Sequence, residues 1–240
     1  MGRFFEARKA TMFARYDRMA KAFSRCSREI VIAVKAGGPD PESNPALRRA
    51  IQNSRAVNMP KDKVLAAIKR AQGSDSANYE ERIFEGYAPN GIAVLIVTAT
   101  DNTTRTVANL RVIFKKNGGS LGNEGSVNYL FNKVGVFRLR PAGLDAEELE
   151  LELIDHGLED MGEGETEDGE PLLIASCGFG DFGAMQAALE ARGIEPVSSA
   201  VEYHPMTTTE LSDDDANKVL EVVGLLEGDD DVQKVFHTLA

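Results

Sequence analysis

The run Ile92–Val97 is apolar at every position, and this continuity constrains the fold more than any other feature of the chain. A strand with one solvent-exposed face alternates apolar and polar residues, whereas a strand buried on both faces is apolar throughout. The turn residues Pro89-Asn90-Gly91 directly precede the run and predict a hairpin with an earlier strand over Glu81–Tyr87. We therefore expect a sheet in which residues 92–97 form a central strand.

The elements that follow this hairpin are too few to complete a sheet domain. Residues 101–103 have the composition of a helix start, residues 117–119 end that helix, and alternation over 127–131 predicts one more strand. This order, β-β-α-β, lacks one helix and one strand of a split βαβ unit. The missing pair is predicted at the far end of the chain, as a helix capped by Ser212 and a strand over 231–236.

The segment between these two halves forms a complete set of its own. A βαββαβ unit has its two ends close together, so its insertion into another domain at an exposed turn is tolerated. We expect an α+β protein with an N-terminal three-helix domain followed by two ferredoxin-like α/β domains, one inserted in the other. The predicted strands of the inserted unit are 134–140, a short one near Glu159, 171–176 and 196–203, and its helices are 144–156 and 182–192. The predicted domains are 1–75 (basic, helical), 76–133 plus 204–240 (discontinuous α/β) and 134–203 (inserted, acidic).

The N-terminal part predicts three short helices. Apolar residues recur at steps of three and four over residues 17–36, which is the seam of an amphipathic helix. Gly37-Gly38-Pro39 ends this helix, and Asn44, as an N-cap ahead of a proline, begins the second. Asn58 and Pro60 separate the second helix from the third. Three helices with short connections form a small bundle.

Charge is distributed unevenly along the chain. Residues 1–73 hold 16 Lys and Arg against 6 Asp and Glu, a balance of +10, although the whole chain has a formal net charge of -11. An ordinary solvated helix face carries mixed signs, so one sign across three consecutive helices favours a surface that binds a polyanion, either DNA or RNA. The predicted nucleic-acid-binding residues are Arg8, Lys9, Arg15, Arg18, Lys21, Arg25, Arg28, Lys35, Arg48, Arg49, Arg55, Lys61, Lys63, Lys69 and Arg70.

Four of these cations, Arg18, Lys21, Arg25 and Arg28, recur at the same helical steps as the apolar seam, one or two positions ahead of its members. We expect them to share one exposed helix face and to contact one phosphate backbone together. Reversing their charges should then leave the apolar seam intact and the bundle folded.

A second, weaker anion contact is predicted at the start of the helix that follows the central strand. Backbone N–H groups at a helix start attract anions, and Asn102, Thr103 and Arg105 would supply the contact. Against this, Asp101 offers its own carboxylate as a cap.

The sequence lacks a catalytic constellation. Its three histidines are isolated, no nucleophile elbow occurs, and no Cys-His spacing fits zinc, so we expect a non-enzyme with no cofactor and no metal. The acidic run Glu159–Glu170 lacks the pattern of a calcium loop and is predicted to be a solvated loop. Cys26 and Cys177 stand in apolar patterns and are predicted to be reduced packing residues.

Location and partners follow from the same composition. No apolar run is long enough to span a bilayer, and charges stand where a signal peptide would need its apolar region, so we expect a cytoplasmic protein without membrane contact. From Pro141 to the end there are 3 basic residues against 26 acidic ones. This acidic C-terminal half is expected to be available for a protein partner.

Several motifs resemble those of the YebC family, over nearly the whole chain. They are Lys35–Pro41, Asn44–Arg48, Asn58–Asp62, Glu85–Gly91, Asp101-Asn102 with Arg105-Thr106, Asn117–Gly122, Gly125-Ser126-Val127 and Asp230–Gln233. The resemblance implies a helical domain and two α/β domains in a cytoplasmic non-enzyme, usually described as a probable DNA-binding transcriptional regulator. Mitochondrial relatives are translational activators of cytochrome c oxidase, and bacterial relatives have been linked to ribosomes.

Three functional hypotheses follow. A DNA-binding transcriptional regulator agrees with the cationic surface and with the family description. The alternative is a translation factor that binds ribosomal or transfer RNA, because the cations suit phosphate and shape and are not arranged to read base edges. A small-molecule sensor would need a polar pocket in the α/β domains, and none is evident in the sequence.

Overall fold

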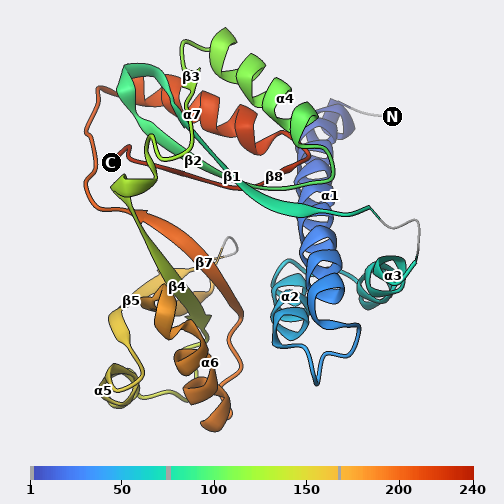
Figure 1. Cartoon of the computed structure of the whole chain (residues 1–240), viewed down its shortest axis with the longest axis vertical. Helices are drawn as coiled ribbons and strands as arrows, with labels where there is room; N and C mark the ends of the chain where they lie inside the picture. Colours follow the sequence, from blue (N-terminus) through green and yellow to red (C-terminus); the bar gives the residue numbers. More distant parts are fainter. Residues whose placement is uncertain (1–2, 74–76, 167–168) are drawn as a thin grey trace. The chain divides into compact units, whose positions relative to one another are not determined.

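In the computed structural model, residues 3–73, 77–166 and 169–240 are described, with side chains from residue 15 onward. These residues form three N-terminal helices followed by two four-stranded sheets, each with two helices, and Figure 1 shows their arrangement within each part. The α+β class is therefore confirmed. The helices are α1 (Arg3–Gly37), α2 (Pro45–Ala56), α3 (Lys61–Ala71), α4 (Thr103–Lys116), α5 (Ala146–Ile154), α6 (Phe182–Ala191) and α7 (Asp213–Glu227).

The connection between α1 and α2 depends on Asn44. Its side-chain oxygen accepts a hydrogen bond from the N–H of Leu47 at 3.0 Å, as an N-cap should, and its amide nitrogen donates to the carbonyls of Ala33 and Gly38, each at 2.8 Å. A side chain at Gly37 would overlap the Asn44 amide, with a Cβ only 2.8 Å from it. The predicted end of α1 and start of α2 are thus confirmed, and one buried amide fixes both.

The three helices enclose a small apolar core. Ile30 and Leu47 are fully buried at its centre, and Val64 faces them from the third helix. The apolar seam predicted over residues 17–36 is therefore confirmed at Cys26, Ile30 and Ala33, whereas Met19, the first apolar residue of that range, is exposed.

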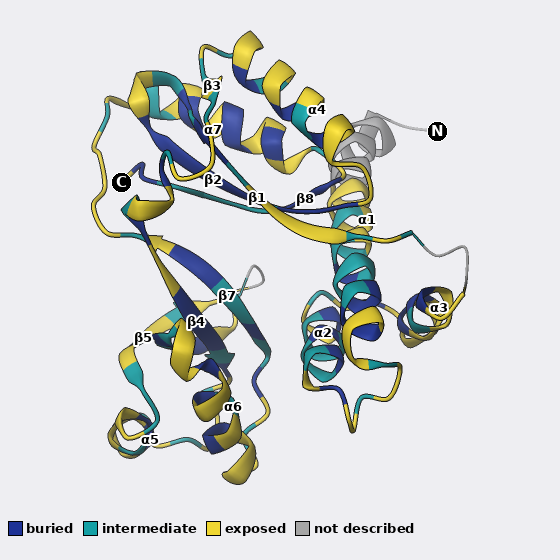
Figure 2. Cartoon of the chain, viewed as in Figure 1, coloured by how far each residue is buried: buried dark blue, intermediate teal, exposed yellow. Residues whose placement is uncertain are grey.

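The first sheet has the strand order β3-β1-β2-β8, from β1 (Glu80–Tyr87), β2 (Ala93–Thr100), β3 (Ser120–Leu121) and β8 (Val232–His237). The predicted central strand is β2, which is buried along nearly its whole length (Figure 2). Its neighbour β8 lies more than 130 residues away in sequence, and the N–H of Ala99 donates to the Asp231 carbonyl at 2.8 Å. The prediction that the C-terminal strand completes this sheet is confirmed.

The predicted strand over residues 127–131 is wrong. The third strand is the two-residue β3, and residues Asn128–Leu130 form a 3-10 turn that leads into β4. The apolar alternation arises because Val127 is buried and Phe131 begins the next strand, while Tyr129 between them is 65% exposed. Alternation over three residues is too short to separate a strand from such a turn.

The second sheet has the strand order β5-β6-β4-β7, from β4 (Phe131–Leu139), β5 (Leu158–Glu165), β6 (Pro171–Gly178) and β7 (Ser198–Pro205). With α5 after β4 and α6 after β6, this is the ferredoxin-like arrangement that the sequence predicts. Phe137, Leu153 and Met185 are buried in its core. Gly135 is required there, because a Cβ would lie 2.5 Å from the Phe182 ring.

The acidic run Glu159–Glu170 is only partly a loop. Its first part lies in β5, which pairs antiparallel with β6 at an edge of the second sheet. Charged side chains are common on edge strands because they hinder pairing with other chains. The strand predicted near Glu159 is therefore confirmed, and the prediction of a solvated loop is wrong for the residues in β5, although the side chains of Glu159, Glu163 and Glu165 are exposed.

Contacts divide the chain into two compact units. The first holds the described residues up to Ile83 with Ile96–Ile113 and Val223–Val235, and the second holds Phe84–Leu95, Phe114–Val222 and Phe236–Ala240. This division runs through the first sheet, so the domain boundaries 1–75, 76–133 plus 204–240 and 134–203 remain a prediction. No helix in the described part of the chain is both long and apolar enough to cross a membrane.

A buried carboxylate fixes the loop between β3 and β4. Glu85 is 5% exposed, and its two oxygens accept hydrogen bonds from the N–H groups of Gly125 (2.7 Å), Val127 (2.6 Å) and Asn128 (2.8 Å). Burial alone would raise the pKa of Glu85, but these three hydrogen bonds outweigh it and hold the pKa below its ordinary value. The ionised carboxylate is therefore part of the folded structure.

We expect Glu85→Gln to lower the free energy of unfolding at pH 7 by about 2–3 kcal/mol, since an amide offers one acceptor where the loop presents three donors. Because the folded pKa is lowered, the stabilisation is fully present above the unfolded pKa of about 4.3 and is lost as the pH falls below it. Chemical unfolding of parent and variant between pH 7 and pH 3 measures this. Glu80→Gln, at an exposed ion pair, is the control, and an equal loss in both variants would contradict the account.

Candidate nucleic-acid interface

The predicted cations of the three-helix domain divide by exposure. Exposed side chains are those of Arg15, Arg18, Lys35, Arg55, Lys61, Lys63, Lys69 and Arg70. Half-buried side chains are those of Lys21, Arg25, Arg28, Arg48 and Arg49. The side chains of Arg8 and Lys9 lie outside the described residues.

Helix α3 presents the densest set of exposed cations. Its buried stripe is formed by Val64, Ala67 and Ala71, with Ile68 partly buried beside them, so the opposite side of the helix faces solvent. Lys69 lies opposite the buried stripe, and Lys61 and Arg70 lie at its two flanks, near the N-terminal and the C-terminal end of the helix. These three side chains can meet a phosphate backbone without any rearrangement of the core.

Other cations of the domain have internal contacts. The Lys63 ammonium lies 4.9 Å from the centre of the Phe23 ring, which is a cation–π distance, and Lys21 pairs with Asp17 at 3.2 Å. The Lys35 ammonium donates to the Ala77 carbonyl at 2.9 Å. Because all three remain at least partly exposed, each can still contact a phosphate.

Arg25 and Arg28 do not lie on an exposed face with Arg18 and Lys21. Arg25 donates to the carbonyls of Glu227 at 2.8 Å and Val232 at 3.2 Å. Arg28, whose side chain is only 12% exposed, donates to the carbonyls of Ala99 and Asp230 and lies 3.5 Å from the Asp231 carboxylate. The prediction of one exposed four-residue stripe is therefore wrong for Arg25 and Arg28, because these two side chains hold α1 against β8.

Reversal of those four charges would therefore not leave the fold unchanged. A glutamate at position 28 would stand beside the Asp231 carboxylate and against backbone carbonyls, where a negative charge is repelled. Among the predicted cations we retain the exposed set as the candidate interface and assign Arg25 and Arg28 a structural role.

Asp231 is the common partner of α1, α4 and β2. It is 1% exposed, and its carboxylate accepts hydrogen bonds from Arg105 and Thr106, each at 2.8 Å, and from Thr100 at 3.3 Å. The Arg28 guanidinium lies 3.5 Å from the same carboxylate, so two guanidinium groups contact one buried carboxylate. Burial would raise the pKa of Asp231, but the hydrogen bonds from Arg105 and Thr106 and the charges of both arginines outweigh it and lower the pKa.

The predicted secondary anion contact is occupied by the protein's own side chains. Arg105 binds Asp231 and also pairs with Asp101 at 2.9 Å. The helix cap is Asn102, whose side-chain oxygen accepts from the Arg105 N–H at 3.0 Å, so the expectation that Asp101 caps the helix is wrong. Thr103 is exposed at the first turn. With both carboxylates bound to Arg105, this helix start does not favour a second anion.

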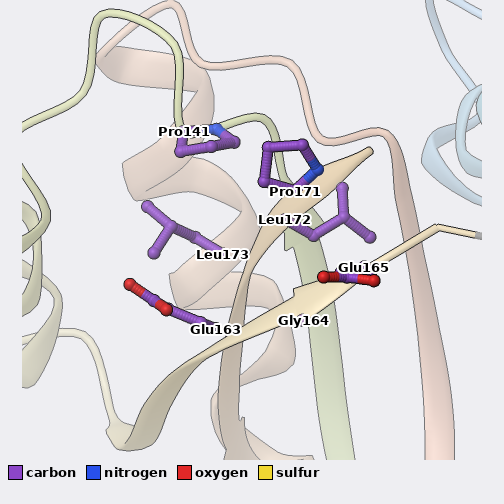
Figure 3. Close-up of a pocket in the computed structure, with 7 residues that line it drawn as sticks. All are labelled: Pro141, Glu163, Gly164, Glu165, Pro171, Leu172 and Leu173. Carbon is purple, nitrogen blue, oxygen red and sulfur yellow. The ribbon is translucent and has the colours of Figure 1, made fainter. Parts of the chain in front are cut away.

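A shallow hollow of about 310 Å³ lies at the β5–β6 hairpin (Figure 3). Its walls are mainly apolar, and among the described residues that line it Glu163 and Glu165 carry the side-chain charges. Such a lining does not favour the sensor hypothesis, which requires convergent polar groups. Over the residues with described positions, no group of three or more His, Cys, Asp and Glu could hold a metal ion. The hollow is lined by Pro141, Glu163, Gly164, Glu165, Pro171, Leu172 and Leu173.

The two cysteines offer no reactive thiol to this surface. Both are buried and free, and burial raises the pKa of Cys26 to about 12 and that of Cys177 to about 11. A thiol that stays protonated is a weak nucleophile and a poor metal ligand, so both side chains serve packing.

Family comparisons place these features in a known protein family. Residues 3–74 match the TACO1/YebC N-terminal domain, and residues 79–239 match the TACO1/YebC second and third domain. The chain belongs to the TACO1/YebC family. The resemblance inferred from its motifs is thereby confirmed.

Relatives in the TACO1/YebC family align with the chain from end to end. A protein from Myxococcus xanthus is 60% identical over 240 residues and one from Flavobacterium johnsoniae 50% over 239, with at least 99% of either chain covered in both comparisons. Both are named probable transcriptional regulatory protein. The crystal structure of a conserved hypothetical protein from Aquifex aeolicus superposes on this chain with a TM-score of 0.79 at 35% sequence identity. The match covers 92% of this chain and 90% of the Aquifex aeolicus chain.

Two motif residues of this TACO1/YebC chain have roles that sequence reasoning missed. The sequence patterns present Glu85 and Asp231 only as members of motifs, yet each is a buried carboxylate that joins distant segments. An acidic residue beside a strand of apolar residues is the signal that could have identified them, because a buried charge requires partners.

Proposed function

We propose that this protein is a non-enzymatic regulator of gene expression that binds nucleic acid through the exposed cations of α1, α2 and α3. The observation that carries the proposal is the set of exposed lysines and arginines on a bundle with a balance of +10 in a chain of net charge -11. Cations on a rigid helical support neutralise phosphates and release counterions, which supplies affinity without base recognition. The names of the relatives support a regulatory role.

DNA is the first candidate ligand, because the relatives are named as transcriptional regulators. In this proposal the helical bundle lies against the duplex, and the protein acts in the cytoplasm. The acidic residues after Pro141 repel the phosphate backbone, so they would keep the second sheet away from nucleic acid and leave it available to a protein partner.

Structured RNA, ribosomal or transfer, is the second candidate. One observation favours it: on α2 the amide of Asn53, the kind of group that reads adenine in a major groove, is engaged with the half-buried Glu29. Cations that contact phosphate and shape without such readers suit the irregular backbone of folded RNA.

Crosslinking in cells, followed by sequencing of the nucleic acid bound to the full chain, tests the choice. A transcriptional regulator predicts enrichment of discrete DNA regions near promoters. Enrichment of ribosomal or transfer RNA without promoter DNA would overturn the DNA proposal in favour of the second candidate. Enrichment of neither over a control protein of equal net charge would contradict both.

A further inference from the structure

Strand β5 stands at one end of the second sheet. It has β6 as its neighbour on one side, and in the described part of the chain no strand pairs with its other side. Most of its residues are exposed. A strand edge of this kind presents N–H and C=O groups with which another extended chain can pair.

The hydrogen bonds at the hairpin end indicate which residues face this open edge. The Thr166 N–H donates to the Glu170 carbonyl at 2.8 Å, so these two residues form a hydrogen-bonded pair. Such pairs alternate with non-hydrogen-bonded ones along an antiparallel ladder, so the next pair, Glu165 opposite Pro171, is not hydrogen-bonded. Pro171 has no N–H, which agrees with this assignment. The N–H and C=O groups of Glu165, and of Glu163 two residues earlier, therefore point away from β6.

The same two residues carry carboxylates on one face of the strand. Residues two apart share a face, and both side chains are exposed. They border the shallow hollow, where Pro171 and Leu173 supply apolar surface (Figure 3). No cation among the described residues pairs with Glu163 or Glu165. A lysine or arginine can therefore pair with them and lay its methylene groups on the apolar surface.

The opposite face of the strand has room for apolar side chains. A Cβ added at Gly162 would meet nothing within 4 Å, so the surface there is open. At Gly164 a Cβ would lie 2.5 Å from the end of the Ile174 side chain, so Ile174 covers that glycine with an apolar surface. An incoming strand places every second side chain on this face. The edge thus fits a chain in which apolar residues alternate with charged ones.

Charge decides which chain fits. From Pro141 to the end there are 3 basic residues against 26 acidic ones, and a second copy of β5 would place carboxylates opposite carboxylates. Like charges directly opposite each other destabilise a strand pair, whereas opposite charges stabilise it. The charges that protect this edge from pairing with another copy therefore select a basic strand.

We propose that the open edge of β5 binds an extended, lysine- or arginine-rich segment of a protein partner as an additional antiparallel strand. Its cations, at every second position, lie opposite Glu163 and Glu165, and the residue between them lies opposite Gly164. In such strand addition the backbone hydrogen bonds supply affinity and the alternate side chains supply specificity. The inference rests on the proposed function in one respect, that the second sheet stays clear of nucleic acid.

A fluorescent heptapeptide in which lysine alternates with valine tests the inference by anisotropy with the full chain. We expect it to bind about fivefold more tightly than a peptide of the same composition in which no two lysines stand two positions apart. Antiparallel pairing directs the backbone N–H groups of the lysines at Glu163 and Glu165, and those of the valines away from β5. Methylation of the lysine N–H groups should therefore abolish saturable binding, whereas methylation of the valine N–H groups should leave it unchanged. Equal binding by all four peptides would overturn the inference, because charge alone would explain it.

Variants of β5 locate the site. Glu163→Gln with Glu165→Gln should weaken binding of the alternating peptide about fivefold, whereas Glu147→Gln with Glu150→Gln, at exposed positions of α5, should change it less than about twofold. Equal weakening by the two pairs would contradict the proposed site.

A proline variant tests the backbone contact. Glu163→Pro removes the outward N–H as well as the charge, and an edge strand tolerates proline where its N–H faces solvent. It should bind the alternating peptide about fivefold more weakly than Glu163→Gln does. Circular dichroism checks the fold of each variant, and the methylated peptides test the same hydrogen bonds independently of the proline variant. A folded proline variant that binds like Glu163→Gln would overturn the strand addition.

Binding of duplex DNA, measured separately, distinguishes this inference from the proposed function. Glu163→Gln with Glu165→Gln should leave the affinity for duplex DNA within about twofold of that of the parent. A parent that binds DNA but not the alternating peptide would overturn the inference and leave the proposed function standing. A parent that binds the peptide as expected, but neither duplex DNA nor structured RNA, would support the inference and overturn the proposed function.

Discussion

Replacing Asp231 with asparagine is expected to lower the free energy of unfolding by about 3–5 kcal/mol. The buried carboxylate accepts hydrogen bonds from Arg105 and Thr106 and lies beside Arg28, so its loss removes the carboxylate that neutralises Arg28 and leaves Arg105 with the exposed Asp101 as its carboxylate partner. Because Arg28 is held between backbone carbonyls in a half-buried position, it cannot move into water without detaching α1 from β8. The effect therefore exceeds that of a surface ion pair, which is about 0–1 kcal/mol.

Asp230→Asn is the matched control for this prediction. It is the same substitution one residue earlier, and the Asp230 side chain is exposed. Asp230 accepts a hydrogen bond from Arg28 through its backbone carbonyl and not through its carboxylate. Urea unfolding of the three proteins at pH 7 measures the difference. We expect the control to unfold like the parent, and a variant at position 231 as stable as the control would show that the Asp231 cluster contributes little.

Local sequence signals were sufficient for the junction between α1 and α2, but not for the length of α1, which spans 35 residues where the pattern predicted a short helix. Gly37-Gly38-Pro39 and Asn44 define the end of α1 and the start of α2, because caps and breakers act through the backbone of a few neighbouring residues. The continuous apolar run likewise identified β2 as the central strand of its sheet.

The third strand of the first sheet could not be found in this way. With only Ser120 and Leu121 it is too short for any alternation, and it exists because β1 offers it a partner, with Gly86 opposite Leu121. The loop that follows is shaped by Glu85, about forty residues earlier. A carboxylate that binds N–H groups so far away leaves no periodic trace in the segment that it organises.

The candidate site could be predicted only in part, because some of its cations contact segments that are distant in the sequence. Helical periodicity correctly separates the apolar seam of α1 from its cations, but it cannot tell which cations face solvent and which face another strand. Arg28 meets Asp231 about two hundred residues later in the chain. Charge counting therefore identified the basic surface, and only the structure separates its exposed members from those that stabilise the fold.

The second large effect is expected from three charge reversals on α3. Changing Lys61, Lys69 and Arg70 to glutamate should lower the affinity for duplex DNA or structured RNA by about two orders of magnitude at low salt. Three phosphate contacts are lost and three repulsions gained. All three side chains are exposed and lie off the buried stripe of α3, so the bundle should remain folded, which circular dichroism would check. The loss should be alike for every nucleic-acid sequence, since phosphate contacts carry no sequence information.

Helix α4 supplies a control of equal charge. Arg111, Lys115 and Lys116 are exposed cations outside the three-helix domain, and their reversal to glutamate changes the net charge by the same amount. If the helical domain is the binding end of the protein, this variant should bind within about threefold of the parent, since only screened long-range repulsion is added. Equal losses in both variants would mean that net charge, and not the helical surface, governs binding.

The salt dependence of binding tests the central claim most directly. Dissociation constants for one duplex DNA and one structured RNA, measured over a series of salt concentrations, give the number of phosphate contacts as the slope of log affinity against log salt. We predict a steep slope for the parent and for the α4 variant, and a slope shallower by about three units for the α3 variant. A parent whose affinity does not change with salt, or an α3 variant with the slope of the parent, would contradict the account.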